Sequence, residues 1–460
     1  MRNRPWKRLE DEWCRDHRLD PICAIGLGNV WRFPFIVGRY GGCIFVLFYL
    51  LFLFIMGFPL LLTEISIGRG SRKNLVHAMH DLAHTHKKAW GTIGFILLMG
   101  CLILMMYYTT VSGWLFAYTS DYMRGAFKGL QDASKYGEVF DNLVKNPVRS
   151  TISMAIVCII SGGVCAIGLK RGVESVVKVL MVALMLLILV LAVYAMTLPN
   201  AAEGLKFYLL PNVDNFMKNP METIFAAMGQ AFFTLSIGIG SMEIFGSYLD
   251  WKTSLTKECI WIIALDTFVA FSSGLIIFPV CASNNIDVSA GPPLIFVSLP
   301  SVFATLPGGQ FWGFLFFLFL LLAALTTVIA VFENLIAYPM DAKLMNRPAS
   351  SVFITLLVIV LSLPCVLGFS TLSFIEPLGE GSTILDLEDF IVSQNLLPIG
   401  GLILFVFAFC KSGWGQENFL REVHEGQSWR YSRGTIFYWK HILPVIIAAI
   451  LLLGYYTFFK

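Results

Sequence analysis

Apolar residues occur in long runs that are separated by short polar or glycine-containing stretches. A helix needs about 20 mostly apolar residues to cross the hydrocarbon core of a bilayer. Such runs predict eleven spans, at residues 22–38, 41–68, 90–122, 150–168, 174–198, 222–249, 258–283, 311–339, 350–370, 388–410 and 438–457. Several are long enough to tilt or to protrude from the bilayer. The pattern therefore predicts an all-α integral membrane protein with about 11 transmembrane helices.

The composition agrees with a lipid bilayer as the solvent. Of 460 residues, 57% are hydrophobic and 14% are charged, whereas soluble proteins carry roughly 25% charged residues. The net charge of +3 gives no sign of a nucleic-acid partner. The ten cysteines form no CxxC pair and no cluster with histidine, so neither a metal centre nor a disulfide framework is predicted. No HExxH or GxSxG motif supports an enzyme.

The distribution of basic residues predicts the orientation in the membrane. Lysines and arginines concentrate in alternate loops, and this bias marks the cytoplasmic side. It predicts a multi-pass protein of the plasma (inner) membrane with a cytoplasmic N-terminus and an external C-terminus. Residues 1–21 form a separate charged segment, which lacks the apolar core and cleavage site of a signal peptide.

Two of the predicted spans contain a break in the apolar pattern. Gly26-Leu27-Gly28-Asn29 interrupts the first span, and Ser236-Ile237-Gly238-Ile239-Gly240 interrupts the sixth. A single Gly-x-Gly more often marks close helix packing. Two breaks five spans apart instead indicate a 5+5 inverted repeat with broken helices 1 and 6 and a binding site at the breaks. The transporter domain would cover 22–457, with repeats at about 22–198 and 222–410 and an extra helix at 438–457.

Sequence motifs near the breaks carry a family resemblance. The run GLGNVWRFPF at 26–35 is followed by the Gly-Gly pair at 41–42, and further motifs are EISIGR at 64–69, QAFFTLS at 230–236, LTT at 325–327 and LPIGG at 397–401. In these motifs and their order, the chain resembles the neurotransmitter:sodium symporter family over residues 22–457. The resemblance implies a leucine-transporter-like fold and a Na+-coupled symporter. Such a protein would import a small neutral amino acid by alternating access.

The resemblance implies two sodium sites. Sodium is a hard cation that takes oxygen ligands. The first site would use the Ala24 carbonyl and the side chains of Asn29, Thr234 and Asp266, completed by the substrate carboxylate. The second would use the Ala323 carbonyl, Thr326, Thr327 and carbonyls near Ile22 and Ile25. For the two threonines, a hydrogen bond to the backbone of their own helix is the alternative role.

The resemblance also implies a substrate site at the breaks. Half-helix N-termini carry free N–H groups and partial positive charge, which suit a carboxylate. The backbone of Gly26 and Gly28 and the Tyr108 hydroxyl would hold this carboxylate. Carbonyls around Phe233 and Ser236 would hold the amine, and Ala24 also belongs to the site. The side chain would contact Leu104, Phe233, Ile239 and Val331, which favours a hydrophobic substrate, although ordinary helix packing would explain each apolar residue taken singly.

Charged residues within spans predict two gates. Arg32 would pair with Asp389 on the outer side, with Gln230 beside them and Phe233 and Tyr108 as a thin lid. An arginine that reaches outward to the interface is the alternative for Arg32. On the inner side, Tyr248, Ser247 and Asp341 resemble the family's cytoplasmic gate, whose basic partner would be Arg2 or Arg4. Glu64 is interpreted as a buried acid that supports the first span.

Two departures from the family pattern affect function. Asp266 stands where relatives carry a neutral sodium-binding asparagine, and Ala270 replaces the hydroxyl that a chloride site would need. The sequence therefore predicts chloride-independent transport. The second departure is residues 10–21, where charged side chains replace an apolar half-helix, and Ile22 replaces an expected glycine. A sequence error and a transport-impaired or receptor-like protein are both open interpretations of this segment.

Overall fold

The computed structural model describes residues 26, 28–128, 130, 134–168, 173, 175–283, 294–305 and 307–458. The predicted N-terminal segment 1–21 and the predicted ligands Ile22, Ala24 and Ile25 lie outside the described residues, as do Arg2 and Arg4.

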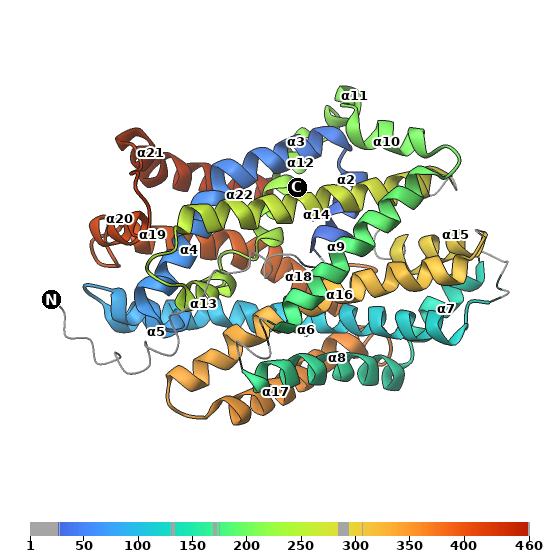
Figure 1. Cartoon of the computed structure of the whole chain (residues 1–460), viewed down its shortest axis with the longest axis horizontal. Helices are drawn as coiled ribbons and strands as arrows, with labels where there is room; N and C mark the ends of the chain where they lie inside the picture. The colour runs from blue at the N-terminus through green and yellow to red at the C-terminus, as the bar shows by residue number, and fades with distance from the viewer. Residues whose placement is uncertain are drawn as a thin grey trace.

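Long apolar helices make up most of the bundle (Figure 1). Within the described ranges, nine helical segments are long and apolar enough to cross a membrane. Four of them lie in the first repeat: α3 with α4 (Cys43–Phe52 and Phe58–Ser71), α6 (Lys87–Arg124), α8 (Pro147–Ile167) and α9 (Ser175–Met196). The other five are α14 (Leu255–Ser283), α16 (Gly309–Asp341), α17 (Arg347–Leu367), α18 with α19 (Ile384–Asp389 and Leu397–Phe409), and α21 with α22 (Arg433–Phe437 and Leu443–Phe458).

The two predicted broken helices account for the remaining spans. The described part of the first begins with a π-helical turn at Gly28–Arg32 and continues as α2 (Phe33–Arg39). The sixth is split into α12 (Pro220–Thr234) and α13 (Ser241–Tyr248). Between them Ser236, Gly238 and Gly240 adopt positive φ angles, which an α-helix cannot contain. The described fold therefore agrees with eleven spans and with interruptions in the first and the sixth.

Short helices in the loops sort to the two ends of the bundle (Figure 1). At one end lie α5 (Leu75–Leu82) and α20 (Gln416–His424). The opposite end carries α7 (Ser134–Val144), α10 (Ala201–Leu209), α11 (Val213–Phe216) and α15 (Leu299–Thr305). We refer to the end with α5 and α20 as the inner face, since the distribution of basic residues predicts that this end lies on the cytoplasmic side.

Close backbone contacts fix the inner half of the sixth span. A Cβ on Gly68 of α4 would clash with the carbonyl oxygen of Glu243, and a Cβ on Gly246 of α13 would clash with the carbonyl of Ile65. Small residues at such positions let helix backbones approach closely in a membrane. The two helices α4 and α13 therefore pack as one unit.

Candidate functional site

A cluster of oxygen atoms joins the two interrupted helices to α14. Asn29 donates from Nδ2 to Asp266 Oδ1 at 2.7 Å and to the Asp266 carbonyl at 2.8 Å. The Thr234 hydroxyl lies 3.2 Å from Asn29 Oδ1 and 3.0 Å from Asp266 Oδ2. All three side chains are buried. The donor set of one carboxylate, one amide oxygen and one hydroxyl suits a hard monovalent cation such as sodium.

Two further hydroxyl groups hold this cluster in place. Tyr49 of α3 donates to Asp266 Oδ2 at 3.2 Å, and Ser273 of α14 donates to the Asn29 carbonyl at 2.7 Å. Tyr49 and Ser273 are fully buried. The sequence analysis did not find either residue, because a lone tyrosine or serine in an apolar span gives no local signal.

The two threonines predicted for a second sodium site lie on α16 beside the first break. The Thr326 hydroxyl donates to the Ala323 carbonyl at 2.8 Å, and Thr327 donates to the same carbonyl at 3.5 Å. This is the backbone-bonded arrangement that the alternative interpretation expects. A Cβ on Gly26 would nevertheless clash with the Thr327 hydroxyl. Thr327 therefore faces the unwound part of the first span, where the resemblance places the site.

A small cavity lies between the two breaks. Its walls are formed by residues from both interrupted helices and by α6, α16 and α19, namely Gly26, Gly28, Asn29, Leu104, Tyr108, Phe233, Thr234, Ser236, Thr327 and Leu397. The open volume is about 10 Å³, which is room for about one water molecule. The wall combines polar groups, such as the side chains of Asn29 and Tyr108, with the apolar side chains of Leu104, Phe233 and Leu397.

Six residues predicted for the substrate line this cavity: Gly26, Gly28, Leu104, Tyr108, Phe233 and Ser236. Ile239 and Val331 are buried but are not part of its wall. Ile239 instead packs against Gly100 of α6, and its carbonyl accepts a hydrogen bond from Cys101. The contacts of Ile239 and Val331 with a substrate stay predictions.

Arg32 and Asp389 meet above the cavity on the outer side. Arg32 Nη2 lies 3.4 Å from Asp389 Oδ2, and the guanidinium covers the Phe233 ring at 4.3 Å from its centroid. The other Asp389 oxygen accepts from Tyr107 at 3.1 Å and from Ser393 at 2.5 Å. Gln230 donates to the Gly28 carbonyl at 3.1 Å. The ion pair therefore lies on the outer side of the cavity wall that Phe233 forms, and its role as a gate stays a prediction.

Among the described residues, Glu64 contacts the sixth span. Its two carboxylate oxygens accept from Gly238 N at 2.7 Å and from Met242 N at 3.0 Å. Gly238 lies in the interruption and Met242 in the first turn of α13, so both amides lack helical partners. Our interpretation of Glu64 as a buried structural acid is consistent with these contacts, and its support of the first span stays a prediction.

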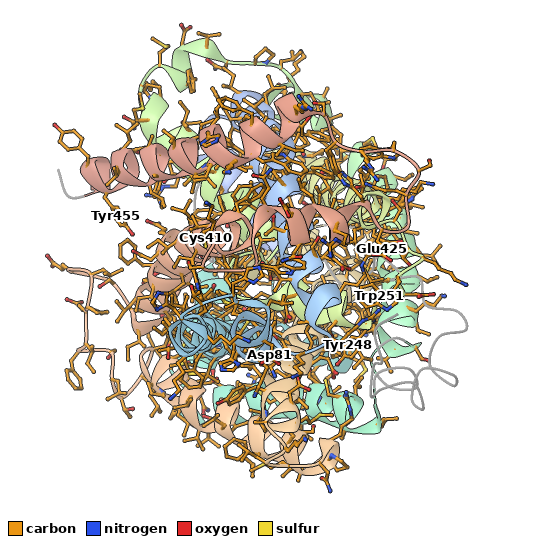
Figure 2. The ribbon with its side chains drawn as sticks, turned by 90° about the vertical axis from the view of Figure 1, so that its left-hand side faces the viewer. Asp81, Tyr248, Trp251, Cys410, Glu425 and Tyr455 are labelled. Carbon is orange, nitrogen blue, oxygen red and sulfur yellow. The ribbon has the colours of Figure 1, made fainter. Side chains whose placement is uncertain are left out.

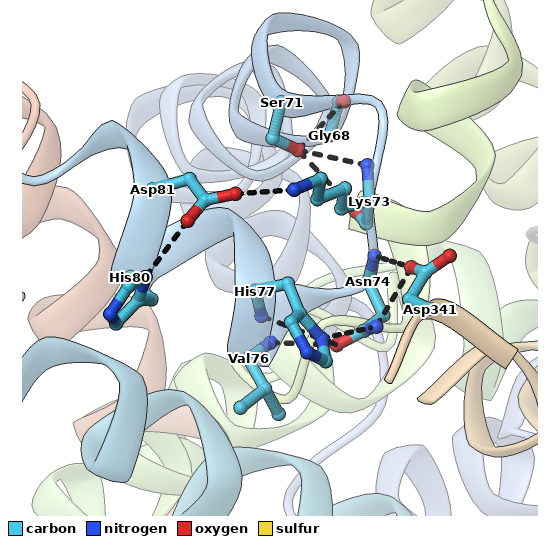
Figure 3. Close-up of polar contacts among 9 residues, drawn as sticks. All are labelled: Gly68, Ser71, Lys73, Asn74, Val76, His77, His80, Asp81 and Asp341. Carbon is cyan, nitrogen blue, oxygen red and sulfur yellow. Dashed lines mark hydrogen bonds and ion pairs between the residues drawn. The ribbon is translucent and has the colours of Figure 1, made fainter. Parts of the chain in front are cut away.

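The inner face is held by contacts among α5, α13, α16 and α17. Asp341 Oδ2 accepts from the Asn74 backbone at 2.6 Å and from Asn74 Nδ2 at 2.7 Å (Figure 3). Tyr248 donates to Glu333 at 2.8 Å, and Glu333 pairs with both terminal nitrogens of Arg347 at 2.8 Å. The predicted gate residues therefore contact Asn74 and Glu333, and Ser247 donates to the Ile244 carbonyl of its own helix.

Further charged groups surround this face (Figure 2). Arg72 lies over the Trp251 ring at 4.6 Å. Asp81 pairs with Lys73 and His80 (Figure 3). Partial burial raises the pKa of Asp81, but the hydrogen bonds from Lys73 and His80 outweigh it, so that the pKa lies below its ordinary value. The pair of Lys73 and Asp81 links the loop after α4 to the last turn of α5.

Comparisons with known proteins place the chain in a family. Two interrupted helices whose breaks meet at an oxygen-lined site are typical of secondary transporters. A model of the sodium:neurotransmitter symporter family matches residues 21–129 and 139–459. The chain belongs to this family, and it is a sodium-dependent, multi-pass membrane transporter rather than an enzyme.

Individual relatives agree with this assignment. An uncharacterised sodium-dependent transporter of Bacillus subtilis, YhdH, is 32% identical over 92% of this chain and 91% of its own length. The sodium- and chloride-dependent taurine transporter of Rattus norvegicus is 25% identical over 92% of this chain and 74% of its own. The crystal structure of MhsT in complex with L-phenylalanine is similar, with a TM-score of 0.85 and 31% identity over 96% of this chain and 99% of MhsT. The fold is therefore the leucine-transporter-like fold with its inverted repeat.

Proposed function

We propose that the protein imports a small neutral, hydrophobic amino acid together with sodium by alternating access. The observation that carries the proposal is the oxygen cluster of Asn29, Thr234 and Asp266 beside a cavity whose wall includes Leu104 and Phe233. Asn29 and Thr234 belong to both the cluster and the cavity wall. A substrate carboxylate in the cavity would therefore lie next to the cation, which couples the two binding events.

Entry of the substrate would need movement of the cavity wall. The open volume of about 10 Å³ is too small for an amino acid. Phe233 lies under Arg32, so separation of Arg32 from Asp389 would release the ring and widen the cavity toward the outer face. The similar structure of MhsT is a complex with L-phenylalanine. This supports an apolar amino acid as the class of substrate.

Sodium-dependent binding tests this proposal. The purified protein should show a higher melting temperature with one or more apolar amino acids when sodium is present. The increase should disappear when a large organic cation replaces sodium, because such a cation cannot fit among the oxygens of Asn29, Thr234 and Asp266. A thermal-shift screen of the twenty amino acids in both media measures this effect. Equal binding in both media would contradict the sodium coupling.

Uptake separates a transporter from a receptor-like protein. Reconstituted vesicles with a sodium gradient should accumulate the amino acid identified in the screen. Sodium-dependent binding without uptake would favour the transport-impaired alternative that residues 10–22 raised. We further propose that the inner face lies in the cytoplasm and that transport needs no chloride, since the Asp266 carboxylate supplies a negative charge at the sodium cluster.

The contact between Asn74 and Asp341 should stabilise the closed inner face. Asn74 also caps α5 by accepting from the amides of Val76 and His77. Aspartate caps a helix as well as asparagine does, but Asn74→Asp would set a carboxylate against Asp341. We expect this variant to shift the protein toward an open inner face and to weaken sodium-dependent binding several-fold.

Two matched variants control this experiment. Asn74→Ser keeps a capping side chain without adding a charge. It should therefore weaken sodium-dependent binding less than Asn74→Asp does. In the double variant Asn74→Asp with Asp341→Asn, donor and acceptor exchange places, and binding should recover. Equal loss in the serine and aspartate variants would show that the cap, rather than the contact with Asp341, determines the effect. Binding isotherms for sodium provide the measurement.

A further inference from the structure

Glu243 is a buried acid that the proposed transport site does not use. It lies in α13, the inner half of the sixth span, and its side chain is fully buried. Neither carboxylate oxygen has a hydrogen-bond partner among the described residues. By contrast, Glu64 on the neighbouring α4 receives two backbone hydrogen bonds. Glu243 therefore differs from the structural acid beside it.

The charged groups on the elements packed against α13 give Glu243 no described counter-charge. Glu64 of α4 and Asp341 of α16 act on it as like charges. The nearby cations have other described partners. Arg69 binds Glu422 and the Thr253 carbonyl. Arg72 binds the Ser247 carbonyl, and Arg347 binds Glu333. On α5, His77 contacts Asn74. Among the described residues, an ionised Glu243 would therefore be both buried and repelled.

An isolated carboxyl group is stable in such surroundings only in its protonated, neutral form. Burial of an unpaired charge costs far more free energy than burial of the same group with its proton. Intramembrane acids that persist without an ion-pair partner commonly mark sites that bind protons or ions. The described surroundings of Glu243 in the closed inner face therefore favour the protonated acid.

The position of α13 connects this proton to a movement. Its N-terminal side follows the interruption at Ser236–Gly240, and the chain leaves helical geometry again at Leu249. The helix is therefore joined to its neighbours by non-helical segments at both ends and packs on α4 as a unit. Tyr248, in its last turn, contacts Glu333 of α16. Opening of the inner face would break that contact and bring water toward Glu243.

We propose that Glu243 is a proton-binding residue through which cytoplasmic protons hold the inner face closed. This inference rests on the proposed transport cycle. The closed face admits only the protonated acid, whereas a hydrated, open face admits the carboxylate as well. Linkage then requires that a low cytoplasmic pH favours the closed face and that a high pH favours the open one. Access only from the inner side makes the proton a regulator and not a transported ion.

Infrared spectroscopy of the purified protein tests the proton without any transport. A protonated carboxylic acid has a carbonyl band that a carboxylate lacks. The difference spectrum between the wild type and Glu243→Gln should contain this band. Glu243→Met provides a second neutral variant if glutamine impairs folding. Glu425→Gln is the matched control, since Glu425 is an exposed acid on the same face (Figure 2), and it should leave the band unchanged.

Vesicle experiments test the link to the inner face. Proteoliposomes with the inner face toward the lumen would take up radioactive sodium in the presence of a mixture of the twenty amino acids. One titrating group changes an equilibrium by at most about tenfold per pH unit. We expect wild-type and Glu425→Gln uptake to be about threefold or more lower at a lumenal pH of about 6 than at about 8. Uptake by Glu243→Gln and Glu243→Met should not depend on lumenal pH.

The two measurements separate the possible failures. An unchanged carbonyl band in both Glu243 variants would overturn the proton site. A lost band with undiminished pH dependence of uptake would overturn the link to the inner face. If the wild type binds sodium but takes none up, the proposed transport cycle fails, and the infrared band still decides whether Glu243 holds a proton.

Discussion

Replacement of Asp266 by asparagine is expected to lower the affinity for sodium by at least about tenfold, which corresponds to about 1.4 kcal/mol. The carboxylate contacts Asn29, Thr234 and Tyr49 and is fully buried. A unit charge about 4 Å from a cation contributes about 4 kcal/mol at an effective dielectric constant of 20. Asparagine keeps the shape and one oxygen but removes that charge. Titration of sodium-dependent binding by the wild type and the variant measures the change.

The same variant tests the proposed independence of chloride. Wild-type uptake should survive replacement of chloride by gluconate, because Asp266 already supplies a fixed negative charge at the sodium cluster. Asp266→Asn should take up substrate better in chloride than in gluconate if a mobile anion can restore the lost charge. Ala270, one turn further along α14, carries no hydroxyl for such an anion, so Asp266→Asn with Ala270→Ser should show the stronger chloride effect.

Tyr49→Phe is the matched control for this pair of experiments. It removes the hydroxyl that donates to Asp266 and keeps the ring that packs against Phe33 at 5.0 Å. Sodium affinity should fall less than in Asp266→Asn, since the charge is retained. Wild-type uptake that stops in chloride-free buffer would refute the assignment of Asp266, whatever the variants do.

The fold could be predicted from the lengths of the apolar runs, because the thickness of the bilayer sets the length of each helix. The helix boundaries were less certain. The predicted span 388–410 begins four residues earlier, at Ile384, because Thr383 and Asp386 form a capping box. The prediction also missed the short loop helices. Those helices depend on caps and tertiary contacts, such as that between Asn74 and Asp341, which have no apolar periodicity.

The candidate site could be predicted only in part. The resemblance to the family pointed to Asn29, Thr234 and Asp266, and the first two of these lie beside the breaks in the apolar pattern. The contact of Glu333 with Arg347 could not be predicted, because Arg347 begins α17 and counted only as a loop charge in the sequence. Partners that join different helices leave no periodic pattern. Their roles in sodium binding and gating stay predictions.

Reversal of either charge in the outer ion pair, as Arg32→Asp or Asp389→Arg, is expected to reduce uptake by at least about tenfold. The side chains of Arg32 and Asp389 are 16% and 31% exposed. Two like charges about 4 Å apart repel by about 4 kcal/mol at an effective dielectric constant of 20, and part-exposed groups in contact with water experience less than this. The closed outer face would lose its ion pair and gain a repulsion. Sodium-driven uptake of the amino acid identified in the screen provides the measurement.

Exchange of the two charges should restore part of the uptake. The pair would regain its attraction, but an arginine at position 389 could not accept the hydrogen bonds that Tyr107 and Ser393 now donate to Asp389. An aspartate at position 32 would also lose the contact of the guanidinium with the Phe233 ring. Recovery should therefore be incomplete, and the double-mutant cycle should still show a favourable coupling.

A neutral variant shows whether the ion pair itself matters. Arg32→Gln keeps a polar side chain of moderate length and removes the charge, so its uptake should lie between the wild type and Arg32→Asp. Tyr107→Phe leaves the ion pair intact and removes one hydrogen bond to Asp389, and it should have the mildest effect. A gate formed by Arg32 and Asp389 would be contradicted if Arg32→Gln took up substrate at the wild-type rate and the exchanged pair showed no recovery.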